Sequence, residues 1–429
     1  MMHSPGSRFA SPRALALGAW MLGLLALQGC AKQEPPAPTE PIALGHYRAT
    51  LTLPGGELPF GLDIAREDSK YVAYLINGTE RVRVSDVAVA NGRVDMRMPA
   101  FGNRLSAGID GSELKGDVVL VKLDGKEQVI PFVARHGVTY RFFPQPTTDN
   151  ADLGGRWSVT FTDEEGKRNP AVGEFTQSHG EVTGTFLTGT ADHRFLAGEM
   201  RGDEFALSAF DGAHAFLYKG KINARDELEG TYWSGLAWRE TFAGHRNEAA
   251  NIDAAERATQ LRANAKGLDF TFPDLDGKPV SLRDERFKGK VVVVALAGSW
   301  CPNCHDEAAF LAPYYKSNRE RGLEVVSLMF EQFGDVARAV PAVRQFRAKF
   351  GIEYQTLIAG VNDKQNAATR LPQLNNVFAF PTTVFVDRQG RVRRIHTGFS
   401  GPATGEHYQR LIEAFDATVE ELLAEPAKT

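Results

Sequence analysis

The sequence predicts two antiparallel β domains followed by an α/β domain. Short segments of alternating apolar and polar residues, separated by Gly and Asp turns, run from residue 44 to residue 246. This alternation is typical of strands with one buried face. After residue 267, strand-like and helix-like segments alternate, which predicts βαβ units and a largely parallel central sheet. The length of 429 residues fits about two to four domains.

The composition is that of an ordinary soluble chain, with 43% hydrophobic and 24% charged residues. A formal net charge of −4 argues against a strongly basic surface, so we expect no nucleic-acid partner. Three cysteines are too few for a disulfide-rich scaffold or a four-cysteine zinc site. We therefore expect neither a metal nor a cofactor, and the odd count implies that one cysteine has a separate role.

The N-terminus explains that separate cysteine. Arg8 and Arg13 precede an apolar run over residues 14–27, which is followed by Leu-Gln-Gly-Cys30. The run is shorter than the roughly 20 residues of a membrane-spanning helix and predicts a signal peptide over residues 1–29. The ending resembles a bacterial lipobox, which implies lipidation of Cys30. A plain signal peptide cut near Ala31 is the alternative interpretation.

The lipid anchor predicts a protein of the cell envelope that faces the periplasm. No Asp follows Cys30, and in proteins with this resemblance that favours the outer over the inner membrane. Residues 30–43 are rich in Pro and polar residues, so we expect an extended tether. Outside the cytoplasm, a two-cysteine site can cycle between thiol and disulfide.

The two predicted β domains, residues 44–148 and 151–246, resemble each other. Gly-His-Tyr at residues 45–47 matches Gly-Arg-Trp at residues 155–157, and Glu-Leu-Lys-Gly at 113–116 matches Glu-Leu-Glu-Gly at 227–230. The two landmarks occur in the same order and at nearly the same spacing, which predicts an internal duplication.

Residues 247–266 lose the β alternation and are dominated by Ala, Glu, Arg, Gln and Leu, which predicts a helical connector. The α/β domain then spans residues 267–429. We expect its strands at residues 291–296, 323–328, 383–386 and 391–395, and its helices at residues 301–321, 336–350 and from about residue 405.

The residues that carry chemistry are Trp-Cys-Pro-Asn-Cys at 300–304, between an apolar strand and a predicted helix. A C-x-x-C at this place indicates a redox motif of the thioredoxin type. The unpaired N–H groups and positive dipole end of the first helical turn stabilise a thiolate. We expect Cys301 to be the exposed nucleophile and Cys304 to be the resolving thiol, with Pro302 in the first helical turn.

At residues 268–420 the chain resembles the TlpA/ResA-like thiol–disulfide oxidoreductases of the thioredoxin superfamily. The resemblance rests on the Trp300–Cys304 motif, on Glu307, and on Phe-Pro-Thr-Thr at residues 380–383. It implies a thioredoxin-like fold and an enzyme, most simply a disulfide reductase, with protein disulfides as substrates and a membrane electron donor.

The resemblance also implies roles for single residues. Pro381 would be cis and lie against the disulfide, Trp300 would shape the contact surface, and Glu307 would tune proton transfer. Phe380 and Thr382 would contact the substrate. The chain departs from thioredoxin at Ala295, where thioredoxin has a buried Asp, so Glu307 or water must take up the proton role.

Other interpretations of the motif remain open. Cys301 to His305 also fits the C-x-x-C-H pattern of covalently attached haem, and the same residues could supply part of a metal site. A peroxiredoxin shares the fold, and a fixed structural disulfide is the simplest alternative. Within the redox interpretation, a protonated His305 beside the site would favour the Cys301 thiolate.

The β domains allow a function of a different class, in which a binding or assembly lipoprotein carries an accessory redox domain. No single residue supports it. A group of polar residues in the second β domain is more simply explained as surface side chains than as metal ligands; it comprises Asp192, His193, Asp211 and His214. The direction of electron flow depends on the reduction potential, which Pro302 and Asn303 do not fix.

Overall fold

The computed structural model describes residues 41–98, 102–145, 147–252 and 258–426. The predicted signal peptide and Cys30 lie outside these ranges. Within them, no helix has the length and apolar character needed to cross a membrane.

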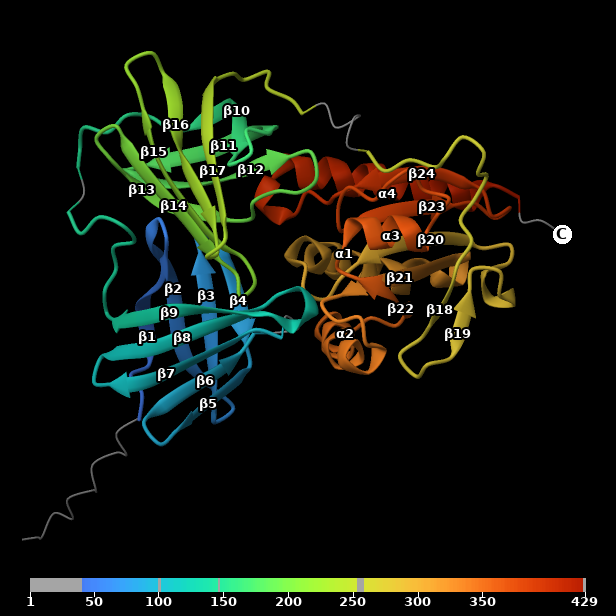
Figure 1. Ribbon diagram of the computed structural model, residues 1–429, viewed down its shortest axis with the longest axis horizontal. Helices are drawn as coiled ribbons and strands as arrows, with labels where there is room; N and C mark the ends of the chain where they lie inside the picture. Colours follow the sequence, from blue (N-terminus) through green and yellow to red (C-terminus); the bar gives the residue numbers. More distant parts are fainter. Residues whose placement is uncertain (1–40, 99–101, 146, 253–257, 427–429) are drawn as a thin grey trace, which may run out of the picture. The chain divides into compact units, whose positions relative to one another are not determined.

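The first β unit is a nine-stranded antiparallel sheet with the order β4-β3-β2-β1-β9-β8-β7-β6-β5 (Figure 1). Alternation of apolar residues along each strand builds its core, as in β1, where Tyr47, Ala49 and Leu51 are fully buried. The strands are β1 (Gly45–Leu53), β2 (Gly56–Glu67), β3 (Lys70–Asn77), β4 (Glu80–Val84), β5 (Asp86–Ala90), β6 (Arg93–Arg97), β7 (Arg104–Asp110), β8 (Glu113–Val121) and β9 (Glu127–His136), with the short helix η1 (Leu123–Gly125) before β9.

The second β unit is a closed antiparallel barrel of eight strands, β10 to β17, in sequence order. Aromatic side chains fill its interior, with Trp157, Phe161 and Phe186 almost fully buried. The strands are β10 (Gly155–Asp163), β11 (Arg168–Ser178), β12 (Glu181–Thr188), β13 (Leu196–Arg201), β14 (Glu204–Phe210), β15 (Ala215–Ile222), β16 (Glu227–Ser234) and β17 (Trp238–Arg246). The predicted pair of antiparallel β domains is confirmed.

The matching sequence landmarks occupy equivalent places in the two units. Strands β1 and β10 both begin at the glycine of the first landmark, and β8 and β16 both begin at the glutamate of the second. The aromatic residue of the first landmark also makes the same contact in each copy. Tyr47 Oη donates to the Ala43 carbonyl at 2.7 Å, and Trp157 Nε1 donates to the Leu153 carbonyl at 2.9 Å, four residues back in both cases.

The two β units share apolar contacts. Phe210 and Leu217 of the barrel belong to the hydrophobic cluster of the first sheet, where the Phe60 and Phe210 ring centroids lie 4.8 Å apart. The hydrophobic cluster of the α/β domain instead consists of residues between Leu261 and Leu423. Among the described residues, the β units are therefore joined by apolar packing that does not extend into the α/β domain.

The α/β domain has a five-stranded sheet with the order β22-β21-β20-β23-β24. Strands β20 to β22 are parallel, whereas β23 pairs antiparallel with both β20 and β24. The predicted largely parallel sheet is therefore wrong. It is mixed, because β23 runs antiparallel to β20 and the turn at residues 387–390 then joins β23 and β24 as a hairpin. The strands of this sheet are β20 (Val291–Ala297), β21 (Leu323–Glu331), β22 (Gln355–Val361), β23 (Thr382–Val386) and β24 (Val392–Thr397). Two further strands, β18 (Thr271–Pro273) and β19 (Pro279–Ser281), pair with each other in a separate sheet.

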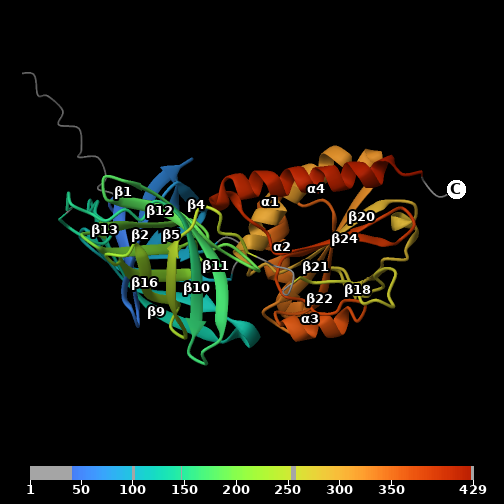
Figure 2. The same cartoon turned by 90° about the horizontal axis from the view of Figure 1, so that it is seen from above.

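Helices cover both faces of this sheet, with α1 and α4 on one face and α3 on the other (Figure 2). Tyr314 Oη donates to Asp416 at 2.8 Å and ties α1 to α4. The helices are α1 (Pro302–Asn318), α2 (Val336–Phe350), α3 (Lys364–Arg370) and α4 (Glu406–Ala424), with short helices η3 (Glu285–Phe287), η4 (Arg319–Arg321) and η5 (Pro402–Thr404).

The predicted helical connector is wrong for its described residues. Residues 247–252 and 258–266 form turns and a bridge at Leu261, and residues 253–257 lie outside the described part. Local side chains and tertiary contacts satisfy the backbone instead. The Asn247 side chain accepts from the Ala249 N–H, and the Arg262 N–H donates to the Gln373 carbonyl. Such contacts compete with helical hydrogen bonds and override helix propensity.

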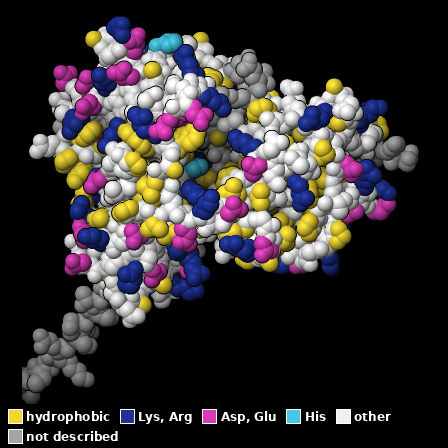
Figure 3. Space-filling view, in the orientation of Figure 1, with side chains coloured by type: hydrophobic (Ala, Val, Ile, Leu, Met, Phe, Trp, Pro, Cys, Tyr) yellow, Lys and Arg dark blue, Asp and Glu magenta, His cyan; other side chains and the backbone are white. Residues whose placement is uncertain are grey.

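Charged side chains of both signs are interspersed over the face of the molecule shown in Figure 3. This mixture is the surface expected of a chain with a net charge of −4.

The equivalent glycines of the second landmark provide a test of the β units. A Cβ on Gly116 would lie 2.0 Å from the Ser106 carbonyl oxygen, and one on Gly230 would lie 2.4 Å from that of Lys219. Gly116→Ala and Gly230→Ala should each lower the free energy of unfolding by about 1–3 kcal/mol, because the strands must move apart. Gly108→Ala is the control, since its Cβ would lie 3.8 Å from the nearest atom. Calorimetric melting that ranks Gly108→Ala with the other two would contradict this account.

Candidate redox site

The two cysteines lie where the buried strand β20 passes into helix α1. All seven residues of β20 are buried, which fixes the position of the following turn. Cys301 is the N-cap of α1 and Pro302 is its first residue, as predicted. The Cys304 N–H, which has no backbone acceptor within the first helical turn, donates to Cys301 Sγ at 3.2 Å.

Cys301 and Cys304 form a disulfide with their Cα atoms 5.2 Å apart, within the usual range for such bonds. The expectation that Cys301 is exposed is wrong for this state. Cys301 is only 4% exposed and Cys304 1%. The loop before β23 covers one side of the pair, and residue Asn303 between the cysteines is itself buried.

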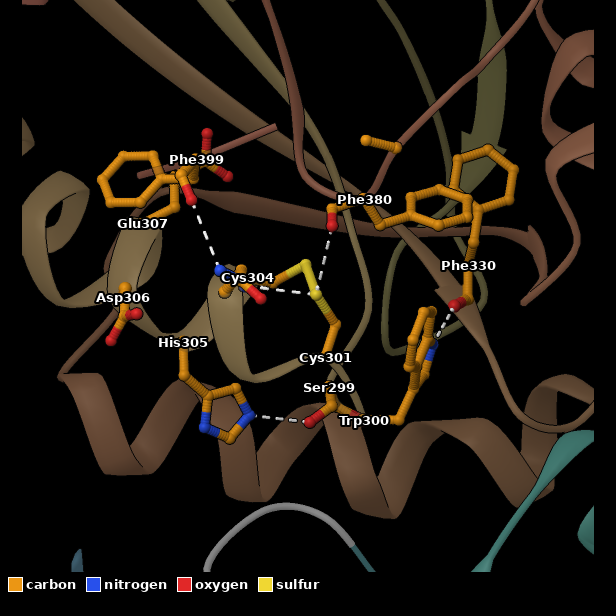
Figure 4. Close-up of a disulfide and its surroundings, with 12 residues drawn as sticks. Ser299, Trp300, Cys301, Cys304, His305, Asp306, Glu307, Phe330, Phe380 and Phe399 are labelled. Carbon is orange, nitrogen blue, oxygen red and sulfur yellow. Dashed lines mark hydrogen bonds between the residues drawn. A yellow bond between two sulfur atoms is a disulfide. The ribbon is translucent and has the colours of Figure 1, made fainter. Parts of the chain in front are cut away.

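The covering loop contains Pro381, and the Phe380–Pro381 peptide bond is cis, as the resemblance implied. The Phe380 carbonyl oxygen lies 3.4 Å from Cys301 Sγ (Figure 4). Thr382 is fully buried, and its hydroxyl donates to the Ala379 carbonyl at 2.8 Å. The substrate contacts of Phe380 and Thr382 stay predictions, with the Phe380 backbone next to the sulfur and the Thr382 side chain turned into its own loop.

Trp300, directly before Cys301 in the chain, is fixed next to Phe380. Its Nε1 donates to the Phe330 carbonyl at 2.7 Å, and its ring meets the Phe380 ring edge to face with centroids 5.9 Å apart. The indole is therefore held by strand β21 and by the loop that contains Pro381, which defines part of the surface beside the disulfide.

Glu307 is buried in α1, and burial raises the pKa of its carboxyl to about 7. The Thr383 hydroxyl donates to this carboxylate. Thr383 pairs with Ala295 across strands β23 and β20, so their side chains share one face of the sheet. The Glu307 carboxyl thus reaches the strand position at which thioredoxin has its buried Asp.

A second buried carboxyl, Glu331 at the end of β21, was not predicted from the sequence. The Ser299 N–H and hydroxyl donate to its two oxygens at 2.8 and 2.6 Å, and burial raises its pKa to about 7. The position of Glu331 at the carboxyl end of a predicted strand could have identified it as a site residue. Side chains at the carboxyl ends of parallel strands line the functional edge of such sheets. Glu331 holds the turn that leads to Cys301.

The expectation that a protonated His305 assists the thiolate is wrong. Burial and the nearby Lys349 ammonium lower the pKa of His305 well below its usual range, so the ring is neutral. Both ring nitrogens have partners, because Nε2 lies 2.7 Å from the Ser299 carbonyl oxygen and Nδ1 lies 3.0 Å from Lys349 Nζ. This arrangement gives His305 a structural role and disfavours the haem interpretation.

The two aspartates among the polar residues of the second β domain are not surface side chains, so the surface interpretation is wrong for them. Asp192 and Asp211 are each 2% exposed. Asp192 Oδ2 accepts from Asn303 Nδ2 at 3.0 Å, and Arg194 forms an ion pair with Asp306 of α1. Sequence reasoning missed this contact because it joins residues more than a hundred positions apart. Among the described residues, no group of three or more His, Cys, Asp and Glu side chains is placed to hold a metal.

Comparisons with known proteins agree with this geometry. Residues 262–410 match the Redoxin family. The thiol-disulfide oxidoreductase ResA of Geobacillus kaustophilus (strain HTA426) is 27% identical over 156 residues, covering 36% of this chain and 79% of that protein. ResA of Bacillus subtilis (strain 168) is 27% identical over 145 residues, covering 34% and 73%.

Among solved structures, the thiol:disulfide interchange protein of the thioredoxin family from Chlorobium tepidum TLS matches with a TM-score of 0.29 and 22% identity, over 37% of this chain and 97% of that one. The matches to the Redoxin family and to ResA both fall on the domain that holds the disulfide. The domain that holds the disulfide therefore matches the Redoxin family and is similar to the ResA thiol-disulfide oxidoreductases.

Proposed function

We propose that this protein is an extracytoplasmic thiol–disulfide oxidoreductase that reduces disulfides in partner proteins. The observation that carries the proposal is the cysteine pair at the first turn of α1, beside the cis peptide bond of Pro381. A helix start stabilises a thiolate, and the Phe380 backbone gives an extended partner segment a place beside the sulfur. The similarity to ResA proteins supports the same reaction class.

The reaction begins with the reduced pair. The Cys301 thiolate attacks one sulfur of the partner disulfide, a new S–S bond forms, and the leaving sulfur takes the electron pair and a proton. Cys304 then loses its proton and attacks Cys301 Sγ, which releases the second partner sulfur as a thiolate. Two electrons have passed to the partner, and the chain holds the Cys301–Cys304 disulfide. An external dithiol reduces this bond again; we propose a donor in the membrane.

Glu307 is the group that accepts the Cys304 proton in this scheme. It lies on the same helix, one turn beyond Cys304, and is buried with a raised pKa. A general base works best when its pKa lies near the working pH. The carboxyl thus suits the role that Ala295 leaves open in β20.

The location belongs to the same proposal. A lipid on Cys30 and the tether that follows would hold the redox domain at the envelope membrane, on the outer membrane in preference to the inner one. Labelling with a radioactive fatty acid that is lost in Cys30→Ala would support this location, and labelling that persists would contradict it.

Replacement of each cysteine tests the mechanism. Cys301→Ala should lower turnover of insulin or glutathione disulfide by about 10³-fold or more, because the nucleophile is removed. Cys304→Ala should instead accumulate mixed disulfides at Cys301, visible on non-reducing gels and removed by dithiothreitol. Full activity of Cys301→Ala would exclude the mechanism.

Glu307→Gln tests the proton acceptor. In the native chain the resolving step should quicken as pH rises through about 7, since the ionised carboxylate is the active form. The Gln variant should lose this rise and be about 10²-fold slower at pH 8, with a smaller deficit at pH 5.5. Rapid-mixing fluorescence would report the step. Glu331→Gln is the matched control, because that carboxyl has the same raised pKa but binds Ser299. Equal pH profiles for all three proteins would rule out the role.

The same substitution has a consequence for stability. The ordinary pKa of Glu307 is 4.5 and its folded value is about 7, so the neutral form is favoured in the fold. The contribution of the neutral Glu307 carboxyl to the free energy of unfolding is complete below about pH 4.5 and is lost as pH rises through 7. Glu307→Gln should remove this loss, because the amide does not ionise. Between pH 4.5 and pH 8, the free energy of unfolding of the variant should therefore rise by up to about 3 kcal/mol relative to that of the native chain. Urea unfolding of both proteins at pH 4.5 and pH 8 measures this change. If the variant and the native chain differ by the same free energy of unfolding at both pH values, the carboxyl titrates normally.

A further inference from the structure

One segment of the barrel, Asp192 to Arg194, contacts the redox helix α1. We call it the barrel loop. Asp192 Oδ2 accepts hydrogen bonds from Asn303 Nδ2 at 3.0 Å and from the Gly401 N–H at 2.8 Å. Asn303 also donates to the Phe399 carbonyl at 3.3 Å. A barrel carboxylate is therefore bonded to the residue that lies between the two cysteines.

Arg194 makes the second contact. Its guanidinium pairs with Asp306, two residues after Cys304, and with Glu80 of the first β unit at 2.8 Å; its Nε lies 3.5 Å from Asp211 Oδ2. The Arg194 side chain is only 8% exposed. Burial lowers the pKa of Arg194, but the surrounding carboxylates more than offset this and raise it, so the arginine is charged. One arginine thus joins both β units to the redox helix.

His193, between these two residues, fixes the loop to the barrel. Its ring is inside the barrel, where Nδ1 is hydrogen-bonded to the Tyr218 hydroxyl and the ring stacks on Tyr232 with centroids 5.4 Å apart. Arg194 has a φ of 62°, a left-handed conformation that L residues other than Gly, Asn and Asp seldom adopt. An anchored middle residue and a constrained backbone place Asp192 and Arg194 at the redox helix.

The disulfide that lies next to this contact is poorly accessible. Exchange requires a partner sulfur to reach Cys301 Sγ, which depends on exposure. Cys301 is 4% exposed, and the Phe380 carbonyl oxygen lies 3.4 Å from its sulfur. Asn303, between the two cysteines, is buried and donates a hydrogen bond to Asp192. The Phe399 carbonyl oxygen accepts from Asn303, the residue between the cysteines (Figure 4). A small disulfide needs little of this surface, whereas a folded protein must contact the area around the sulfur.

The contact between the barrel loop and helix α1 is polar and can open. It consists of ion pairs and hydrogen bonds, and the hydrophobic clusters of the barrel and of the redox domain are distinct. Charges in such a contact are rehydrated when it opens, which offsets much of the lost attraction. Polar contacts between domains permit relative motion.

We propose that Asp192 and Arg194 are specificity-determining residues, which hold the barrel loop against the redox helix and so favour small disulfides over folded protein partners until the contact opens. This inference rests on the proposed function and adds to it which substrates the site accepts. The residues act through access and not through the sulfur chemistry.

The test compares two probes on the reduced full-length chain: insulin, a protein disulfide, and glutathione disulfide. Arg194→Gln should raise kcat/KM for insulin about tenfold or more and change that for glutathione disulfide less than about twofold. Asp306→Asn should do the same from the redox side while Arg194 keeps Glu80 and Asp211, so it remains decisive if Arg194→Gln fails to fold. Arg201→Gln, which breaks an exposed barrel ion pair with Glu204, is the control with no expected change.

The outcomes separate this inference from the proposed function. An insulin-selective gain in either variant, with an unchanged reduction potential, supports the access role. No gain, or an equal gain with both probes, overturns it, because the pair would then be neutral or act on sulfur reactivity. If the native chain turns over neither probe, the proposed function itself fails.

Discussion

The redox chemistry depends on one constraint, which is that a sulfur atom must be held at the first turn of a helix. The seven buried residues of β20 fix where the chain leaves the sheet, and the Cys301 N-cap fixes where α1 begins. The N–H groups of that turn can then stabilise negative charge on sulfur. This junction is contacted by the Pro381 loop, Trp300 and Glu331. Each of these contacts would be lost if the helix began one residue earlier or later.

Around this junction the fold buries several ionisable groups and leaves most of them neutral or paired. Glu307 and Glu331 have raised pKa values, and His305 a lowered one, because burial disfavours the charged form. Arg194 stays charged because carboxylates surround it. The site therefore separates two tasks: the neutral groups around the cysteines can exchange protons, and the ion pairs of Arg194, including the one with Asp306, hold domains together.

The sequence predicted what local patterns determine. Alternation identified the β units, and the run from Ala297 to Cys304 located the disulfide, because strand burial and helix capping are encoded within a few residues. It failed where distant contacts decide. The segment after residue 246 lacks a helix in its described part because tertiary hydrogen bonds replace helical ones. The sheet is mixed because β23 pairs with β20 in the antiparallel sense. The burial of Cys301 could not be predicted because it depends on the distant loop that contains Phe380 and Pro381. The contact between Asp192 and Asn303 could not be predicted because it joins a barrel residue to a helix 111 positions away.

The aromatic filling of the barrel has a mechanical consequence. A closed eight-stranded barrel packed with rings such as Trp157, Phe161 and Phe186 resists compression, and dense interiors transmit displacement instead of absorbing it. His193 belongs to that filling, so its neighbours cannot swing aside alone. For the barrel loop to move away from α1, the whole barrel must rotate as a rigid body. The first sheet, which shares apolar packing with the barrel, would turn with it.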